Sequence, residues 1–149
     1  MSPPFLQEGK NVTELSEEEI AREQEFLDEI PKISLGAFFM PPIWGIAHGD
    51  WPCILFYPLW IFCDNLLYNA WKYPSVLSGI LAVLTILITA AIMLGYARIS
   101  SPRSAHRAAE QGKTLKAYLK SERIWAVTMI ILALIMLVFA TWYNLTIRV

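Results

Sequence analysis

The chain has 149 residues, of which 56% are hydrophobic and 17% are charged, and its mean hydropathy is +0.44. A soluble domain usually has an apolar share of about 45–50%, so this composition argues against an ordinary soluble protein. The net charge of −1 hides a division, because residues 1–33 carry nine acidic side chains and residues 98–123 carry seven basic ones.

Residues 1–15 contain Pro and Gly and lack hydrophobic periodicity, so we expect a disordered tail. A helix is predicted over residues 16–31, because Ser16 is a good N-cap and Glu19, three residues later, completes a capping box. Pro31 should end this helix. The helix is amphipathic, and its acidic polar face argues against free insertion into anionic lipid. Its apolar face comprises Ile20, Leu27 and Ile30.

The next apolar stretch begins with residues 34–49, which are interrupted by Pro41 and Pro42. A crossing of the ~30 Å hydrocarbon core needs about 20 residues at 1.5 Å per residue. This segment is too short and too broken to supply them. We therefore expect an interfacial or re-entrant segment here.

Residues 51–71 have room for one crossing and form the predicted transmembrane helix 1. Asp50 is expected as its N-cap, with Pro52 in the first turn. Pro58 predicts a kink in mid-helix, because its ring removes one backbone hydrogen bond that neighbouring helices must replace.

Two charge-free stretches, residues 75–97 and 124–145, are each long enough to span and form the predicted transmembrane helices 2 and 3. The basic loop between them, residues 98–123, should stay cytoplasmic by the positive-inside rule. With three crossings the N-terminus is then cytoplasmic and the C-terminus is outside.

The basic loop at residues 98–123 is predicted to contain helices. A short helix that starts near Ser101 or Ser104 should stop at Gly112, and Thr114 should cap a long helix that continues through the third crossing. Spacings of three and four place basic and apolar side chains on separate ridges of the long helix. The basic ridge should contact anionic lipid headgroups or a partner. Either the apolar ridge receives the acidic N-terminal helix, or that helix stays free until a partner binds. The basic ridge comprises Lys113, Lys116, Lys120 and Arg123, and the apolar ridge Leu115, Tyr118 and Leu119.

Asp64 is the most informative single residue, because it lies inside the predicted transmembrane helix 1. An aspartate at the bilayer centre costs about 2.5–3.5 kcal/mol on insertion scales and is a functional candidate by default. It is either a proton or cation site, or a polar clasp between helices with Thr85, Thr141 or Asn144 as its partner. The candidate intramembrane site comprises Asp64, Asn65, Asn69, Tyr57 and Trp60.

His48 and Asp50 form a candidate interfacial site. A histidine there could bind a proton or a metal, yet a metal site needs three or four ligands and none besides Asp50 is nearby. We expect no metal and favour loop capping or a headgroup contact. The sequence lacks a Gly-rich phosphate loop, a Ser/His/Asp order and a Cys-x-x-Cys pair, so it predicts neither an enzyme nor a bound cofactor. The basic loop is explained more economically by topology and lipid contact than by nucleic-acid binding.

The stretch LGAFFMPPIWG, from Leu35 to Gly45, resembles the "AFF…P.W" opening of small bacterial inner-membrane proteins of unknown function, the group called DUF2628-like. In that group an acidic or polar N-terminal stretch leads to this motif and then to a few hydrophobic helices. The basic residue that those proteins often place after the Trp is absent here, and His48 is the nearest candidate. The resemblance implies a small bacterial membrane protein and no particular activity.

These observations predict an all-α integral membrane protein with three transmembrane helices, an interfacial or re-entrant segment and an amphipathic cytoplasmic N-terminal helix. The first function hypothesis is an accessory or scaffold subunit of the bacterial cytoplasmic membrane. It would bind a protein partner, or a second copy of itself, through its cytoplasmic elements. The alternative is a small oligomeric transporter or channel with Asp64 in the pathway.

Overall fold

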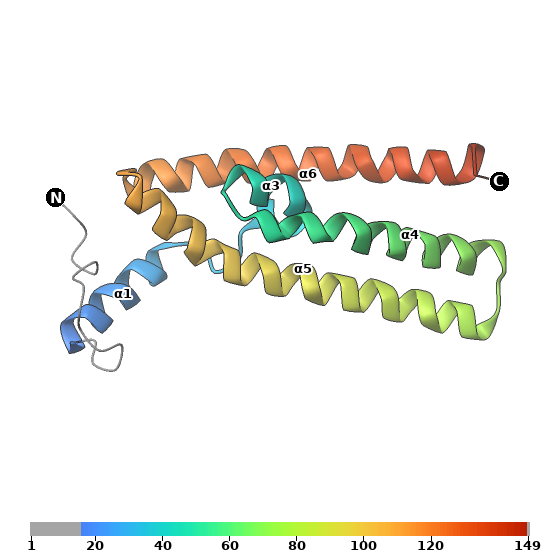
Figure 1. The fold of residues 1–149 in the computed structure, drawn as a ribbon, viewed down its shortest axis with the longest axis horizontal. Helices are drawn as coiled ribbons and strands as arrows, with labels where there is room; N and C mark the ends of the chain where they lie inside the picture. The colour runs from blue at the N-terminus through green and yellow to red at the C-terminus, as the bar shows by residue number, and fades with distance from the viewer. Residues whose placement is uncertain (1–15, 149) are drawn as a thin grey trace.

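The computed structural model describes residues 16–148, and within that range every regular element is a helix. The tail predicted over residues 1–15 lies outside the described part. In chain order the elements are α1 (Glu17–Glu29), α2 (Leu35–Phe39), α3 (Pro41–Ala47), the 3₁₀ helix η1 (Trp51–Leu55), α4 (Phe56–Lys72), α5 (Val76–Glu110) and α6 (Leu115–Thr146). Helices α4, α5 and α6 run along the length of the molecule, and α2 and α3 lie among them toward one end (Figure 1).

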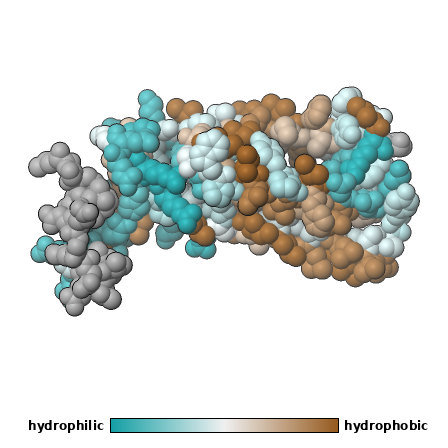
Figure 2. Space-filling view, viewed as in Figure 1, coloured by the Kyte–Doolittle hydropathy of each residue, from teal (hydrophilic) through white to brown (hydrophobic). Residues whose placement is uncertain are grey.

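The molecule has two distinct ends. The α1 end carries α1 and the turn at residues 111–114, and the Arg148 end carries the turn at residues 73–75 together with Arg148 (Figure 1). By length and composition, two helices of the described chain qualify as candidate membrane spans, α5 and α6. Hydrophilic residues gather toward both ends in Figure 2, and exposed apolar residues cover much of the surface between them.

Helix α1 begins as its sequence predicts. The Ser16 side chain accepts the Glu19 backbone N–H at 3.3 Å, and the Glu19 carboxylate accepts the Ser16 backbone N–H at 2.9 Å, which completes the capping box. The helix ends at Ile30, whose backbone is extended, as expected for the residue before Pro31.

Residues 34–49 form two short helices rather than one segment on an outer surface. Ser34 caps α2 by accepting the Ala37 N–H, and Met40 separates α2 from α3, where Pro41 occupies the first turn. Helix α2 lies between α5 and α6 and supplies much of the core at the α1 end. The fully buried members of that core are Ala37, Met40, Trp44, Ala97 and Met129.

Two glycines allow this close packing. A Cβ atom added at Gly36 would overlap the Trp44 ring, and one added at Gly45 would lie 2.5 Å from both Cys53 Sγ and Tyr96 Oη. Only glycine fits at these positions, because each faces the body of another side chain. The prolines and glycines of residues 34–49 therefore build the core rather than simply interrupt a helix.

The prediction of one kinked helix over residues 51–71 is wrong. The chain instead forms η1 and then α4, and Pro58 is the third residue of α4. The first N–H groups of a helix have no intrahelical acceptor, so a proline in the first turn needs no kink. Asp50 precedes η1 without a side-chain capping bond, so its predicted N-cap role is also wrong.

Helix α5 continues without a break from Val76 to Glu110, so the prediction of a separate short helix that starts near Ser101 or Ser104 is wrong. Pro102 lies inside the helix, where residues on both sides of it are buried against the rest of the α1 end. Tertiary packing therefore outweighs the hydrogen bond that the proline removes. The buried residues of this part of α5 are all small: Ala97, Ser100, Ser101, Ser104, Ala105 and Ala108.

The turn between α5 and α6 follows the sequence prediction. Gly112 has a positive φ of 76°, and the Lys113 N–H donates to the Ala108 carbonyl at 3.0 Å, as in a Schellman motif. Thr114 Oγ1 then accepts the Ala117 N–H at 3.3 Å and caps α6. Gly112 as the stop and Thr114 as the cap are both confirmed.

Candidate functional site

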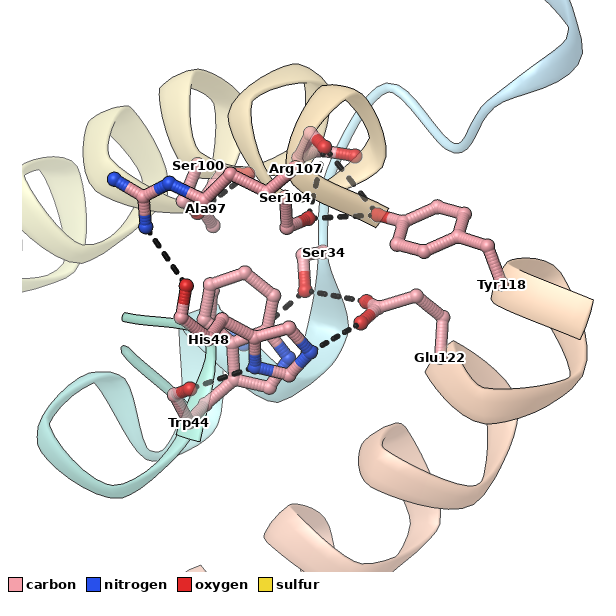
Figure 3. A network of polar contacts seen from close by, with 11 residues as sticks. Ser34, Trp44, His48, Ala97, Ser100, Ser104, Arg107, Tyr118 and Glu122 are labelled. Carbon is pink, nitrogen blue, oxygen red and sulfur yellow. Dashed lines mark hydrogen bonds and ion pairs between the residues drawn. The ribbon is translucent and has the colours of Figure 1, made fainter. Parts of the chain in front are cut away.

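A largely buried histidine–carboxylate pair joins α3 to α6. Glu122 points from α6 into the α1 end, where its Oε2 accepts the Ser34 hydroxyl at 2.9 Å (Figure 3). Its Oε1 lies 3.2 Å from Nε2 of His48, the residue that ends α3. The side chains of His48 and Glu122 are only 16% and 8% exposed.

The two ring nitrogens of His48 face different acceptors. His48 Nδ1 lies 2.7 Å from the Trp44 carbonyl oxygen, which can only accept, so Nδ1 carries a hydrogen. His48 Nε2 lies 3.2 Å from Glu122 Oε1, an oxygen that has no hydrogen-bond partner among the described residues. The contact is therefore a close approach of two ionisable groups, and it is an ion pair only when His48 is protonated.

Aromatic rings enclose the imidazole of His48. The Trp44 ring stacks on it with centroids 4.0 Å apart and an interplanar angle of 18°, and Trp125 meets it edge-on at 5.4 Å. Trp44 is fully buried, and its Nε1 has no hydrogen-bond partner among the described residues. Apolar rings around a charge-bearing pair exclude water and raise the cost of leaving either partner unpaired.

A second set of polar contacts supports the pair from α5. Arg107 Nη1 donates to the His48 carbonyl at 2.7 Å, and Tyr118 Oη lies 2.7 Å from Ser104 Oγ (Figure 3). Burial raises the pKa of Tyr118 to about 12, and the charge of nearby Glu122 adds to this shift. The phenol therefore stays neutral at ordinary pH and can donate to Ser104 or to the Ser101 carbonyl.

The arrangement of Ser34, Glu122 and His48 is not that of a hydrolytic triad. In a triad the serine bonds to the histidine and the acid orients the histidine from its far side. Here Ser34 donates to the acid and is only 2% exposed, so its oxygen cannot reach a substrate. The geometry instead ties α2, α3 and α6 together through the contacts of Glu122 with Ser34 and His48.

The side chains of His48 and Asp50, the two residues of the candidate interfacial site, contact different partners. Asp50 Oδ2 accepts the Tyr96 hydroxyl at 2.8 Å, whereas His48 faces Trp44 and Glu122. Gly49, with a φ of 76°, turns the chain between the two residues. Within residues 16–148 no three His, Cys, Asp or Glu side chains gather closely enough to hold a metal ion.

Asp64 forms a second polar cluster at the Arg148 end. Its Oδ1 accepts Asn144 Nδ2 at 2.7 Å, and its Oδ2 pairs with Arg148 Nη1 at 3.0 Å. Arg148 also donates to Asn65, and its guanidinium lies 4.1 Å from the centroid of the Tyr68 ring. Of the three partners expected for a clasp, Asn144 is the one that bonds to Asp64.

The other members of the candidate intramembrane site lie apart from Asp64. Asn69 is exposed and donates locally to the Asn65 carbonyl at 2.9 Å. Tyr57 is 40% exposed, and Trp60 packs against the core of the α1 end. Tyr57, Trp60 and Asp64 all lie on α4 at spacings of three and four, but Tyr57 and Trp60 are one to two turns nearer to the α1 end than Asp64.

The basic ridge is exposed along the start of α6. Lys113, Lys116, Lys120 and Arg123 are all exposed, and no ion pair joins them to another described residue. The surface that the ridge was expected to offer to lipid or a partner is therefore accessible.

The acidic helix docks only at its C-terminal part. Ile30 is buried with Tyr118, and Phe26 packs beside them. His106 adds a contact of 2.9 Å to Glu23. Ile20 and Leu27 remain 43% and 37% exposed, so the expected apolar face is covered only in part.

Sequence reasoning missed the role of four residues in these clusters: Ser34, Arg107, Glu122 and Arg148. A usable signal exists for one of them. Glu122 follows Tyr118 by four positions and Leu115 by seven, so it lies on the apolar ridge of α6 and not on the basic one. An acid on an apolar ridge predicts a buried partner, although it does not say which residue that partner is.

Comparison with known proteins gives no relative: no family model, no curated protein and no solved structure matches the chain. The resemblance to DUF2628-like proteins stays a prediction. The all-helical fold and the two long apolar helices rest on the structure alone.

Proposed function

We propose that the chain is an integral membrane protein that crosses the bilayer three times, through α4, α5 and α6, with the α1 end in the cytoplasm. Helix α4 has 17 residues and is about 25 Å long, and it runs beside α5. The contacts of Asp64 with Asn144 and Arg148 bring the C-terminal half of α4 beside α6. The basic ridge at the α1 end supports a cytoplasmic position for that end.

Within the membrane we propose a binding role, that of an accessory subunit that presents α1 to a partner protein. One observation carries this proposal: α1 is held by Phe26, Ile30 and the contact of Glu23 with His106. The rest of the helix, with the apolar Ile20 and Leu27, remains exposed. A capped helix with a free amphipathic face is suited to a partner groove that is apolar at its centre and basic at its rim. The basic ridge would hold anionic lipid headgroups beside it.

Transport through Asp64 has less support. Both carboxylate oxygens of Asp64 are bound, one by Asn144 and one by Arg148, which is the arrangement of a clasp between α4 and α6. The charge of Asp64 is already paired with Arg148, so a bound cation would have to compete with that guanidinium.

The test of the binding role is co-purification from native membranes in a mild detergent. The wild-type chain should retain one stoichiometric protein partner, and Ile20→Asp together with Leu27→Asp should lose it, because both changes put charge on the free apolar face. Ala21→Asp adds the same charge on another face of α1 and should retain the partner. Absence of any stoichiometric partner, or its retention by the double variant, would contradict the proposal.

A further inference from the structure

A cleft of about 460 Å³ lies beside His48 at the α1 end. Residues of α3, η1, the end of α5 and the start of α6 line it, so four elements build its wall. None of the described residues that line the cleft is acidic, and two of them, Arg107 and Lys113, are cations. The cleft is separate from most of the basic ridge, because Lys116, Lys120 and Arg123 do not line it.

The guanidinium of Arg107 is held in place by the protein before any ligand binds. One of its nitrogens donates to the His48 carbonyl at 2.7 Å, and a Cβ added at Gly49 would lie 3.5 Å from that nitrogen. Arg107 is half-buried, and no carboxylate of the described chain pairs with it. Arg107 lines the cleft, and its guanidinium has no counter-charge among the described residues.

The other polar groups of the wall define what would fit. Lys113 is exposed and forms no ion pair with a described residue, and Gln111 and Ser121 add neutral polar groups. Both ring nitrogens of His48 are already engaged by Trp44 and Glu122, so the imidazole does not donate to a ligand. The cleft thus offers a planar guanidinium, an ammonium group and neutral donors, which is the chemistry that recognises a phosphate oxyanion.

We propose that this cleft binds a phosphate group, between the Arg107 guanidinium and the Lys113 ammonium. Trp51 and Trp125 also line it, and Trp125 is the second residue of the charge-free run 124–145. Tryptophan is enriched at the level of lipid headgroups, so an anionic phospholipid can reach the cleft from the bilayer. That source rests on the proposed membrane placement, whereas a free phosphate or phosphate monoester can enter from the aqueous side.

Two binding measurements on the purified full chain in dodecyl maltoside distinguish these sources. Native mass spectrometry counts bound dioleoylphosphatidylglycerol, with dioleoylphosphatidylcholine as the zwitterionic comparison, and equilibrium dialysis measures radiolabelled inorganic phosphate. We expect one saturable equivalent in at least one measurement. Phosphatidylglycerol alone identifies a lipid headgroup, and inorganic phosphate alone identifies a soluble ligand. Saturable binding of either probe, or of both, supports the phosphate site.

Matched variants test the position of the site. Arg107→Gln and Lys113→Gln should each weaken binding about tenfold, the effect of losing one charge-assisted hydrogen bond. Arg103→Gln and Lys32→Gln remove the same charges from exposed positions outside both the cleft and the basic ridge and should leave binding unchanged. Lys113→Gln disturbs no side-chain contact of the described chain, so its effect is not a folding defect. The proposal is overturned if neither probe binds saturably, if Arg107→Gln and Lys113→Gln bind like wild type, or if all four variants weaken binding equally.

Discussion

His48 Nε2 lies 3.2 Å from Glu122 Oε1, and this contact joins the end of α3 to the start of α6. With the Ser34 hydroxyl on the other carboxylate oxygen, Glu122 ties three segments that are far apart in the sequence. At the opposite end, Asp64 and Arg148 join α4 to α6 in a comparable way. The long helices are thus connected by polar contacts at both ends, with exposed apolar surface between them.

The first prediction concerns Glu122. Glu122→Gln keeps an oxygen for Ser34 and offers an N–H to neutral His48, so its free energy of unfolding should change by less than about 1 kcal/mol. Glu122→Leu leaves the buried Ser34 hydroxyl and the His48 ring unpaired and should cost about 1–3 kcal/mol. Unfolding by SDS in mixed micelles measures both. Equal losses of stability in the two variants would show that the charge of Glu122, rather than its hydrogen-bonding geometry, maintains this contact.

The second prediction uses four glycines. Gly36→Ala and Gly45→Ala place a methyl group against Trp44 and against Cys53 and should each destabilise the protein by about 1–3 kcal/mol. Gly79→Ala and Gly95→Ala, on α5 with no atom within 4 Å of the new Cβ, should be neutral or stabilising by up to about 1 kcal/mol. Apparent melting temperatures in detergent should separate the two pairs. The same melting temperature for all four variants would mean that α2 and α3 are not packed as described.

The third prediction concerns the Arg148 end. Asp64→Asn keeps a hydrogen bond to Asn144 and loses the ion pair with Arg148, so it should cost about 1 kcal/mol or less, the size of typical intramembrane polar contacts. Asp64→Leu should cost more, because it also leaves the Nδ2 donor of Asn144 without its acceptor. A double-mutant cycle with Arg148→Gln measures the coupling between the two residues. Zero coupling would show that Asp64 does not act as a clasp.

The fourth prediction concerns how α1 docks. Glu23 and His106 are in contact through the ends of their side chains, so cysteines at these two positions should be joined by a short bifunctional maleimide. The yield should persist in 0.5 M salt, because burial of Ile30 and Phe26 contributes more than screened surface charge. Ile30→Asp should abolish it, whereas Ala21→Asp should not. A yield that falls in salt while resisting Ile30→Asp would indicate docking by charge instead.

Local sequence signals predicted the helix boundaries that local chemistry controls. The Ser16 capping box, the glycine stop at Gly112 and the Thr114 cap each depend on contacts within a few residues, and all three occur as expected. Pro58 and Pro102 were harder to interpret, because the effect of a proline depends on whether it falls in a first turn or against a packed neighbour.

The polar clusters were only partly predictable, because their members meet across the fold. Asp64 and Asn144 were foreseen as a pair from the cost of a polar group in an apolar helix. Arg148 was not, because the sequence alone does not show that the end of α6 folds back over Tyr68. Glu122 can contact His48 and Ser34 only because of how deeply α2 and α3 insert between α5 and α6. No local sequence pattern predicts how deeply they insert.

The most direct test of this account is which side of the membrane each part of the chain occupies. Single cysteines at Glu18, Glu110 and Tyr73, in a chain with Cys53→Ala and Cys63→Ala, can be labelled by a membrane-impermeant maleimide in intact and in inverted vesicles. The account predicts that positions 18 and 110 react only from the cytoplasmic side and position 73 only from the outside. Labelling of positions 18 and 110 from opposite sides would contradict it, because α1 and the turn after α5 lie at the same end of the molecule (Figure 1).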